Sequence, residues 1–594
     1  MPESHLDGDD ASSRAPTAYT DTTPLLRSET TSRTSRSSSV SAPDARTGRH
    51  AGSSGEAERG MDEPNVKVSG RRGVCIALSV YVLIFLQASN MSGMTMAQST
   101  IAAELDAYES AMWFTSSYLI AMSSFGPLAG RLAAIFSPRL IIMFTSAFFV
   151  GGAAVSAAAT SLSVFLLGRV VTGLGGAGIF TTAMILVLEL TSRRRRGLFV
   201  GLVNTGFTTG VSLGAVVFGG LVPVTGWRFL FWIQTPLAAL AGLGVYFSLP
   251  ASFRPEKKGE DASTLSKLKQ IDYLGAFLLT GTLVLFLYGL SGTIQIIPIV
   301  VSVGTLVGFV LFESLVASDP IIPVAVLQSR GALLSCLAQL GFMAARWTVL
   351  FYAPVTALAV FGFSPGAAGS MLVPTNLGFG AGGLLVGWLH VRRAGSFWLP
   401  SLVSMALFGA SLLLLSFAAS PAVPTWVFVA IIFANGLCTG ASLNYTLAHL
   451  LHLTPSHTHY IATSLLATFR GFAGSFGTAI GGGIFSRSLR GALETGFRAV
   501  DGTDGLSPAR RLLVTRLVGS PALVHDGGLS AADHRVAVDG YAAGLHVLFQ
   551  AAAVLSVVVV VLQAATGWHG PGDEKEDEEE VRRALAQSDP EYEA

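Results

Sequence analysis

Residues 165–197, FLLGRVVTGLGGAGIFTTAMILVLELTSRRRRG, are the stretch that decides the fold. The segment is apolar enough to cross a bilayer, yet it carries Arg169 inside the hydrophobic span. A cation there costs at least about 2.5 kcal/mol, so it usually faces a wet cavity or a polar partner. Glycines at 173, 175, 176 and 178 let a neighbouring helix come close. The basic run Arg193 to Arg196 anchors the cytoplasmic end. The stretch therefore predicts a closely packed transmembrane helix beside a solute pathway.

Composition places the chain among membrane proteins. Of 594 residues, 51% are apolar and 13% are charged, whereas a soluble globular protein has about 25% charged residues. The net charge of +1 gives no case for nucleic-acid binding. Cys75, Cys336 and Cys438 lie in apolar runs, too far apart for a metal-ligand spacing, so we interpret them as packing residues. The sequence has no recognisable nucleophile–base pair, metal cluster or phosphate-binding loop, so we expect no cofactor, no metal and no enzymatic activity.

Apolar runs follow residue 72, each close to the about 20 residues that a membrane span needs. Arginines and lysines gather in alternate connections, and the positive-inside rule then places both termini in the cytoplasm. The sequence therefore predicts an all-α membrane protein with fourteen transmembrane helices. The expected spans are 73–95, 110–130, 139–159, 164–188, 198–222, 227–249, 272–291, 294–317, 331–357, 366–389, 397–418, 425–448, 460–485 and 541–566.

Four segments are expected to lie outside the membrane. Residues 1–72 are rich in Ser, Thr, Gly and charge, a composition that cannot bury enough surface to order itself, so we predict a disordered cytoplasmic tail. Residues 250–271 form a basic cytoplasmic linker, and residues 567–594 form an acidic, disordered cytoplasmic tail. Residues 487–540 are a long non-cytoplasmic connection, expected as an irregular surface loop with room for one short helix.

Several motifs carry a resemblance to a known family. GRVVTGLGGAG, residues 168–178, resembles the fourth-helix motif of the major facilitator superfamily. WFTSSYLIAMSSFGPLAGRLAAIFSPR, residues 113–139, resembles the family's motif between spans two and three. GFTTGVSLGAVVFGG, residues 206–220, is similar to a glycine motif associated with antiporters. Residues 370–400 and 462–485 look like the fungal fourteen-span branch of drug:proton antiporters, in particular its vacuolar amino-acid and multidrug members.

The resemblance implies an architecture and a cavity. It implies two six-helix bundles, residues 73–249 and 331–566, with two inserted helices at 272–317. In such transporters the first and fourth helices of each bundle line the cavity. Arg346 and Arg470 would lie near the membrane midplane, the latter roughly 15 Å from the start of its span at 1.5 Å per residue. The candidate cavity residues are Gln87, Asn90, Arg169, Arg346, Asn435, Asn444, Tyr445 and Arg470.

Gating and coupling residues are also implied by the motifs. In the family, a loop like that at Gly130, Arg131 and Arg139 latches the bundles on the cytoplasmic side, although Ala134 and Pro138 stand where the family has charged residues. Glu189 can pair with Arg131, or with Arg193 one helical turn away. Gly210 and Gly214 allow close helix contact, which serves packing as well as antiport.

The proton carrier is not identified by the sequence. Asn90 stands where the family often has an acid in span one, and arginine cannot shuttle a proton. Glu189, Asp272 and Glu313 all lie near the cytoplasmic end. A histidine group near span twelve can titrate near neutral pH, or can simply be solvated. This group comprises His449, His452, His457 and His459.

Substrate and location follow from what remains. Three arginines without a cavity carboxylate favour a substrate with a carboxylate or phosphate, and a zwitterionic amino acid fits. In the tail, Asp21, Leu25 and Leu26 resemble an acidic dileucine signal that sorting adaptors read on the way to vacuoles or lysosomes. The family resemblance implies coupling to protons, and we therefore expect a proton-coupled amino-acid transporter of the vacuolar membrane. The alternatives are a plasma-membrane multidrug or toxin antiporter and, from another class, a non-transporting nutrient receptor.

Overall fold

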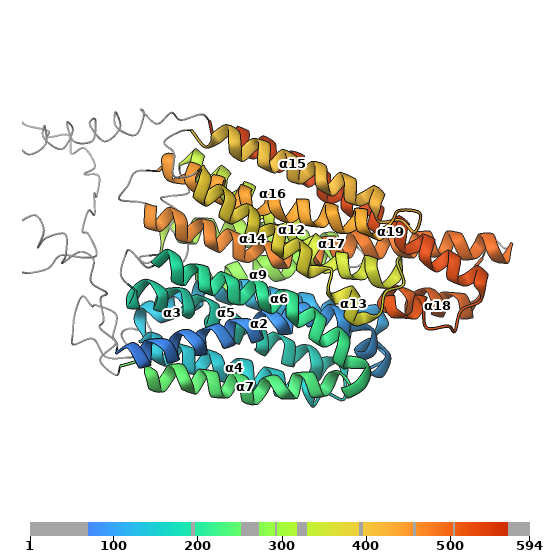
Figure 1. Ribbon diagram of the computed structural model, residues 1–594, viewed down its shortest axis with the longest axis horizontal. Helices are drawn as coiled ribbons and strands as arrows, with labels where there is room; N and C mark the ends of the chain where they lie inside the picture. Colours follow the sequence, from blue (N-terminus) through green and yellow to red (C-terminus); the bar gives the residue numbers. More distant parts are fainter. Residues whose placement is uncertain are drawn as a thin grey trace, which may run out of the picture. The chain divides into compact units, whose positions relative to one another are not determined.

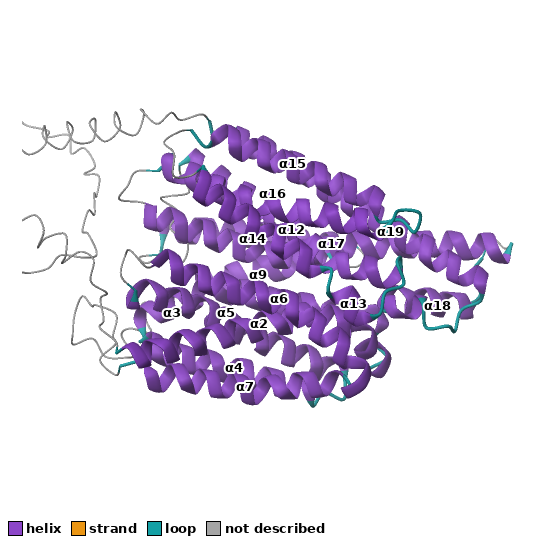
Figure 2. Ribbon diagram, viewed as in Figure 1, coloured by secondary structure: helices purple, strands orange, loops and turns teal. Residues whose placement is uncertain are grey.

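The described part of the chain is helical throughout. A computed structural model describes residues 69–191, 196–250, 272–291, 294–317, 329–390, 396–454, 459–502 and 505–567. Within these ranges every regular element is an α-helix or a short 3₁₀ helix, and none is a strand (Figure 2). The expectation of an all-α protein is therefore confirmed for the described residues.

Among the described residues, the helices form an N-terminal and a C-terminal set along the chain, with a pair of helices between them (Figure 1). The N-terminal set comprises α2 (Gly70–Glu104), α3 (Trp113–Ile135), α4 (Pro138–Ala157), α5 (Leu162–Leu190), α6 (Arg196–Thr225) and α7 (Trp227–Ser248). The helices between the sets are α9 (Tyr273–Leu290) and α10 (Ile296–Leu315). The C-terminal set comprises α12 (Arg330–Ala359), α13 (Pro365–Gly369), α14 (Leu372–Leu389), α15 (Trp398–Ala418), α16 (Thr425–His452), α17 (His459–Asp501), α18 (Pro508–Gly519) and α19 (Ala531–Ala564).

Eleven of the described helices are long and apolar enough to cross a membrane. Three further helices, α3, α14 and α17, run between them, with 23, 18 and 43 residues. The structure thus supports a multi-pass membrane protein with many apolar spans. The count of fourteen spans stays a prediction.

Helix ends are set by local chemistry. Ser137 precedes α4 with Pro138 at its first position, and Oγ of Ser137 accepts a hydrogen bond from the amide of Leu140 at 3.4 Å. Asp272 begins α9 in the same way, with Oδ1 accepting from the amide of Gly275 at 2.7 Å. These side chains satisfy backbone N–H groups that have no partner within the helix.

The glycines of α5 bring other helices within backbone contact. A side chain at Gly173 would collide with the carbonyl oxygen of Tyr118 on α3, and one at Gly175 with the backbone of Phe149 on α4. A side chain at Gly176 would meet the Tyr118 hydroxyl at 2.7 Å. The close approach that the sequence predicts for this stretch is therefore confirmed, and it fixes α3 against α5.

Contacts run mainly within each set. In the N-terminal set α2 packs on α6 and α7, α4 on α5 and α7, and α3 on α5. In the C-terminal set α14 packs on α16, α12 on α17 and α19, and α15 on α16 and α19. Between α6 and α13, a side chain at Gly219 would collide with the carbonyl of Pro365, and one at Gly369 would meet the carbonyl of Ala215 at 2.5 Å. The two sets therefore meet there backbone to backbone.

The expectation of an irregular loop at residues 487–540 is wrong at both ends, whereas the one short helix for which it left room is found as α18. α17 continues to Asp501, α18 and the 3₁₀ helix η4 (Pro521–Val524) follow, and α19 begins at Ala531. The reason is an apolar stripe: Leu489, Leu493 and Phe497 recur every four residues and are buried, so the helix carries its own core beyond the span.

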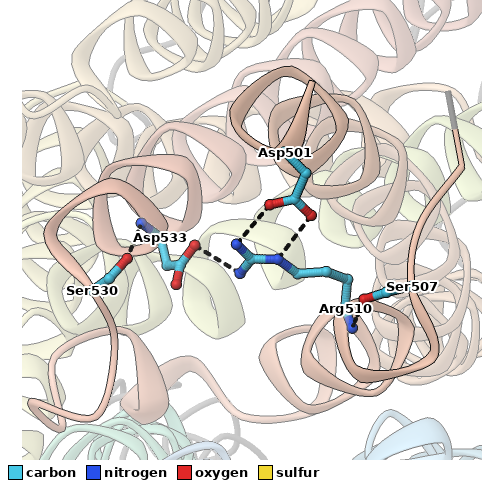
Figure 3. A network of polar contacts seen from close by, with 5 residues as sticks. All are labelled: Asp501, Ser507, Arg510, Ser530 and Asp533. Carbon is cyan, nitrogen blue, oxygen red and sulfur yellow. Dashed lines mark hydrogen bonds and ion pairs between the residues drawn. The ribbon is translucent and has the colours of Figure 1, made fainter. Parts of the chain in front are cut away.

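Arg510 fastens α18 to its neighbours (Figure 3). Its Nε and Nη2 donate to the two carboxylate oxygens of Asp501 at 3.0 and 2.9 Å, and Nη1 donates to Oδ1 of Asp533 at 2.7 Å. Its guanidinium also lies 4.8 Å from the ring centre of Phe497. One side chain thereby joins α17, α18 and α19.

Candidate functional site

Arg169 is the centre of a polar cluster buried in the N-terminal set. It is 0% exposed, its Nε donates to the carbonyl oxygen of Phe114 at 2.8 Å, and its Nη1 donates to Oδ1 of Asn90. Asn90 in turn donates to Oε1 of Gln234 at 2.9 Å. The guanidinium carbon lies 4.7 Å from the ring centre of Tyr118. Nη2 has no hydrogen-bond partner within the described residues, so one strong donor in this cluster is unused.

Arg346 occupies a second cluster in the C-terminal set and is 3% exposed. Its Nη1 donates to the Thr375 hydroxyl and to Oδ1 of Asn435, the latter at 3.3 Å. Its Nη2 donates to the Thr375 carbonyl and to Oδ1 of Asn376, each at 3.3 Å. Asn435 is held in place by donating to Oγ of Ser411 at 2.9 Å. Helices α12, α14, α15 and α16 all contribute to this cluster.

The Arg346 cluster reaches the other helix set. Nδ2 of Asn376 donates to Oγ of Ser212 on α6 at 2.8 Å, and that hydroxyl contacts the carbonyl of Leu372 at 3.4 Å. A continuous chain of hydrogen bonds therefore runs from a buried guanidinium to the contact between the sets.

Neither cluster contains a carboxylate. In the described part of the chain, the ion pairs involve other residues, and amide, hydroxyl and carbonyl oxygens serve Arg169 and Arg346 instead. A buried charge without an opposite charge is costly unless it is well hydrogen-bonded. Such sites favour the approach of an anion, because it supplies the missing charge.

Arg470 lies elsewhere, half-buried on α17 beside the contact with α3. Oγ of Ser123 on α3 donates to the carbonyl of the next residue, Gly471, at 3.1 Å. Nε of Arg470 is buried and has no hydrogen-bond partner within the described residues. The three arginines thus have separate surroundings and do not form one cluster.

The remaining candidate cavity residues are tied to their own neighbourhoods. Gln87 is buried beside Tyr118, whose hydroxyl donates to the Gln87 carbonyl at 3.4 Å. Asn444 donates to a backbone carbonyl of α14 at 2.8 Å, and the Tyr445 hydroxyl lies 2.9 Å from Nδ1 of His390. Through Tyr118, Gln87 therefore borders the Arg169 cluster, whereas these contacts of Asn444 and Tyr445 involve neither arginine cluster.

The candidate gating residues have the following surroundings. A side chain at Gly210 would meet the carbonyl of Phe85 at 2.6 Å, and one at Gly214 would meet the backbone of Ser89 at 2.5 Å, so these glycines set the contact of α6 with α2. A Cβ atom added at Gly130 would lie 3.7 Å from its nearest neighbour, an ordinary contact, so no close approach requires this glycine. The guanidinium of Arg139 lies 4.2 Å from the ring centre of Tyr246 on α7, while Arg131 and Glu189 are half-buried. The choice of partner for Glu189 stays a prediction.

The histidines near the end of α16 are less exposed than solvated side chains would be. His449 is 0% exposed and its Nε2 lies 2.9 Å from the Thr566 hydroxyl. His459 donates from Nε2 to the carbonyls of Leu451 and Thr454, each at 2.9 Å. The prediction of a solvated side chain is therefore wrong for His449, because α16 directs this side chain into the bundle. His457 and the residues of the sorting signal, Asp21, Leu25 and Leu26, lie outside the described residues.

A cavity of about 530 Å³ lies between the two helix sets. The lining comes from α2, α3 and the 3₁₀ helix η1 (Tyr108–Ser110) on one side, from α12 and α17 on the other, and from α18 and η4. None of the eight candidate cavity residues is among the lining residues. Sequence reasoning missed the residues that do carry charge there, Glu109, Arg487 and Arg490. Their one signal was position, since they flank apolar runs.

The family model of the Major Facilitator Superfamily matches residues 78–478. The chain belongs to this superfamily. As a member it is a secondary transporter embedded in a membrane by many apolar helices.

Three related members of the superfamily come from fungi. The acurin A biosynthesis cluster MFS-type transporter of Aspergillus aculeatus is 28% identical over 429 residues, covering 70% of this chain and 76% of that one. A vacuolar membrane amino acid uptake transporter of Schizosaccharomyces pombe is 28% identical over 379 residues, covering 62% and 64%. A multidrug resistance protein of the same yeast is 27% identical over 409 residues, covering 67% and 76%.

Solved facilitator structures share the fold. An inward-facing, occupied bacterial homologue of the human lysosomal transporter Spinster aligns with a TM-score of 0.57 at 14% identity, covering 84% of this chain and 97% of that one. At this identity the likeness concerns the fold alone. The facilitator fold expected from the sequence is therefore confirmed.

Proposed function

We propose that this facilitator moves zwitterionic amino acids across the vacuolar membrane by alternating access, coupled to protons. The observation that carries the proposal is the unused Nη2 of Arg169, a buried cationic donor in a cluster without a described carboxylate. A substrate carboxylate is the group that best satisfies such a donor, because Arg binds carboxylates through two parallel hydrogen bonds. The uptake function in the name of the related yeast vacuolar protein agrees with this substrate class.

The same proposal covers the architecture. Two six-helix bundles, residues 73–249 and 331–566, would rock against each other around the cavity, and the pair at 272–317 would be inserted between them. With α3, α14 and α17 counted as spans, the total is fourteen. Both termini would then lie in the cytoplasm.

Uptake by purified protein in lipid vesicles tests the function. Vesicles with an imposed pH gradient receive a panel of neutral, acidic and basic amino acids and of cationic drugs. We expect uptake of neutral amino acids that collapses when the gradient is removed. Arg169→Lys keeps the charge but loses the planar fork, so uptake should fall at least about tenfold. Arg498→Lys, at an exposed surface pair, is the control and should match the wild type.

Two results would redirect the proposal. Uptake of cationic drugs without amino acids would favour the multidrug alternative, which the names of related proteins support. A folded protein that transports nothing on the panel, even in counterflow, would favour the nutrient receptor. Location is tested separately: with Leu25 and Leu26 changed to Ala, the protein should leave the vacuolar membrane in confocal images. Unchanged location would remove the sorting role of these residues.

A further inference from the structure

The cavity between the helix sets carries charges of opposite sign from opposite sides. Glu109 comes from η1 of the N-terminal set, while Arg487 and Arg490 come from α17 of the C-terminal set. Nη1 of Arg487 donates to the carbonyl of Leu290 at 3.3 Å, so this side chain is partly engaged. Glu109 and Arg490 are exposed.

Glu109 and Arg490 differ from two other charged residues close to them in the chain, which are paired. Glu104 pairs with Arg228, and Glu494 pairs with Arg498 at 3.4 Å. Within the described residues Glu109 and Arg490 take part in no hydrogen bond, ion pair or ring contact. A cavity thus holds one free anion and one free cation on surfaces that belong to different helix sets.

The rest of the lining suits a small amphipathic ligand. Thr115, Ser116 and Thr478 offer hydroxyl groups, while Phe351 and Tyr352 offer aromatic surface. A volume of about 530 Å³ lies within the range of small-molecule sites, about 300–1,000 Å³. Apolar walls with a few polar groups of fixed position are the usual make-up of such sites.

We propose that this cavity is a binding site for a zwitterionic α-amino acid, with its ammonium group at Glu109 and its carboxylate at Arg490. The proposal rests on the function proposed above and names a site distinct from the buried arginine clusters. An amino acid held in this way touches both helix sets at once. It can contact Glu109 and Arg490 together only when the two sets are close to each other. Binding would therefore favour that arrangement of the sets, which couples binding to their movement.

α18 and η4, which also line the cavity, contact the N-terminal set. Val518 and Pro521 line the cavity, and the glycine between them, Gly519, sits against the backbone of Tyr108 on η1, where a Cβ atom would be 2.7 Å from the Tyr108 Cα. Nε2 of Gln98 donates to the Gly519 carbonyl at 3.3 Å. α18 and η4 thus line the cavity on the side where Glu109 lies, so a ligand there would contact them as well as the two helix sets.

Equilibrium binding to the purified full-length protein in detergent tests the site. The probe is radiolabelled leucine, and the competitors are 4-methylpentanoate, which lacks the amine, and 3-methylbutylamine, which lacks the carboxylate. We expect each competitor to bind at least about tenfold more weakly than leucine, or about 1.4 kcal/mol. Glu109→Gln should weaken leucine about tenfold but leave 4-methylpentanoate unchanged. Arg490→Gln should weaken leucine equally but leave 3-methylbutylamine unchanged.

The matched controls are Glu494→Gln and Arg498→Gln, which remove the same charges from α17 outside the cavity. They should bind leucine within about twofold of the wild type. A purely structural role of Glu109 or Arg490 would weaken all three ligands alike, and Glu109→Asp should restore most of the leucine affinity. Thermal melting of each variant confirms that it is folded.

Every outcome separates the site from the transport function. The proposed site is overturned if leucine affinity is unchanged in Glu109→Gln and Arg490→Gln. It is also overturned if the folded wild type binds no leucine. Vesicle uptake that persists in those variants overturns the site and leaves the amino-acid function standing. Selective binding without any uptake supports the site and overturns the transport function.

Discussion

Replacing Arg510 by Ala should release α18 from the helices that hold it. The side chain makes a two-pronged bond to Asp501 and a third bond to Asp533 at 2.7 Å (Figure 3). Hydrogen bonds with Asp501 raise the pKa of the Arg510 guanidinium above its ordinary value; burial opposes this and Asp533 adds to it. A raised pKa means that the stabilisation is complete below the unfolded value and is lost only at strongly alkaline pH. The guanidinium is therefore charged at every physiological pH.

The magnitude follows from how exposed the three side chains are. Arg510 is 21% exposed, Asp501 26% and Asp533 15%. An exposed ion pair contributes about 0.2–1 kcal/mol, whereas a hydrogen bond to a charged group contributes about 1.5–3 kcal/mol. Three bonds in a setting between these limits give about 2–3 kcal/mol for the local opening of α18. That corresponds to roughly 30- to 150-fold faster amide exchange.

Hydrogen–deuterium exchange with mass spectrometry on the detergent-purified protein measures this directly. Peptides from residues 508–519 should exchange faster by the stated factor in Arg510→Ala, while peptides from α4 and α5 stay unchanged. Arg510→Lys should lie in between, because it keeps the charge without the fork. Arg498→Ala removes an exposed pair one helix away and should change α18 exchange less than about threefold. Equal protection of α18 in Arg510→Ala and the wild type would refute this reasoning.

Three further changes test the packing described above. Asn90→Ala leaves a donor of Arg169 without its partner, so the free energy of unfolding should fall by about 1–3 kcal/mol in thermal or denaturant melts; an unchanged melt would place water there instead. Gly440→Ala puts a methyl group against the backbone of α14, so the free energy of unfolding should fall by about 1–3 kcal/mol. In the control Gly380→Ala the methyl group meets no atom within 4 Å, so the free energy of unfolding should stay the same or rise. Equal melting of the two variants would contradict close packing at Gly440. Gly519→Val should push α18 off η1 and speed amide exchange in residues 108–110, and unchanged exchange would show that the contact is not tight.

The fold was accessible from the sequence because its signals are local. The apolar runs and the glycines of residues 165–197 needed no partner to be recognised, and α5 is found where they predict it. The boundaries beyond the spans were less accessible. The predicted span 460–485 ends where the thickness of a bilayer is reached. The helix α17 continues beyond it, because Leu489 and Phe497 extend its buried face.

The site was accessible only in part. The apolar runs place Arg169 and Arg346 deep inside membrane spans, and both are buried, but their hydrogen bonds to Asn90 and Asn435 were not predicted. The unpaired charge of Glu109 could not be foreseen. Such a residue differs from its neighbours only in the absence of a partner, and that is a property of the folded chain rather than of any motif.

The backbone contact between α6 and α13 has a mechanical consequence. Gly219 and Gly369 have no side chains, so at these two positions backbone meets backbone and no rotamer has to rearrange when the surfaces part. We expect that sliding or rolling along this line would need few side-chain rearrangements, and that the polar links there, from Asn376 to Ser212 and from Ser212 to the Leu372 carbonyl, would resist it. A backbone contact held by a few hydrogen bonds would let the two sets move relative to each other and return to one defined position.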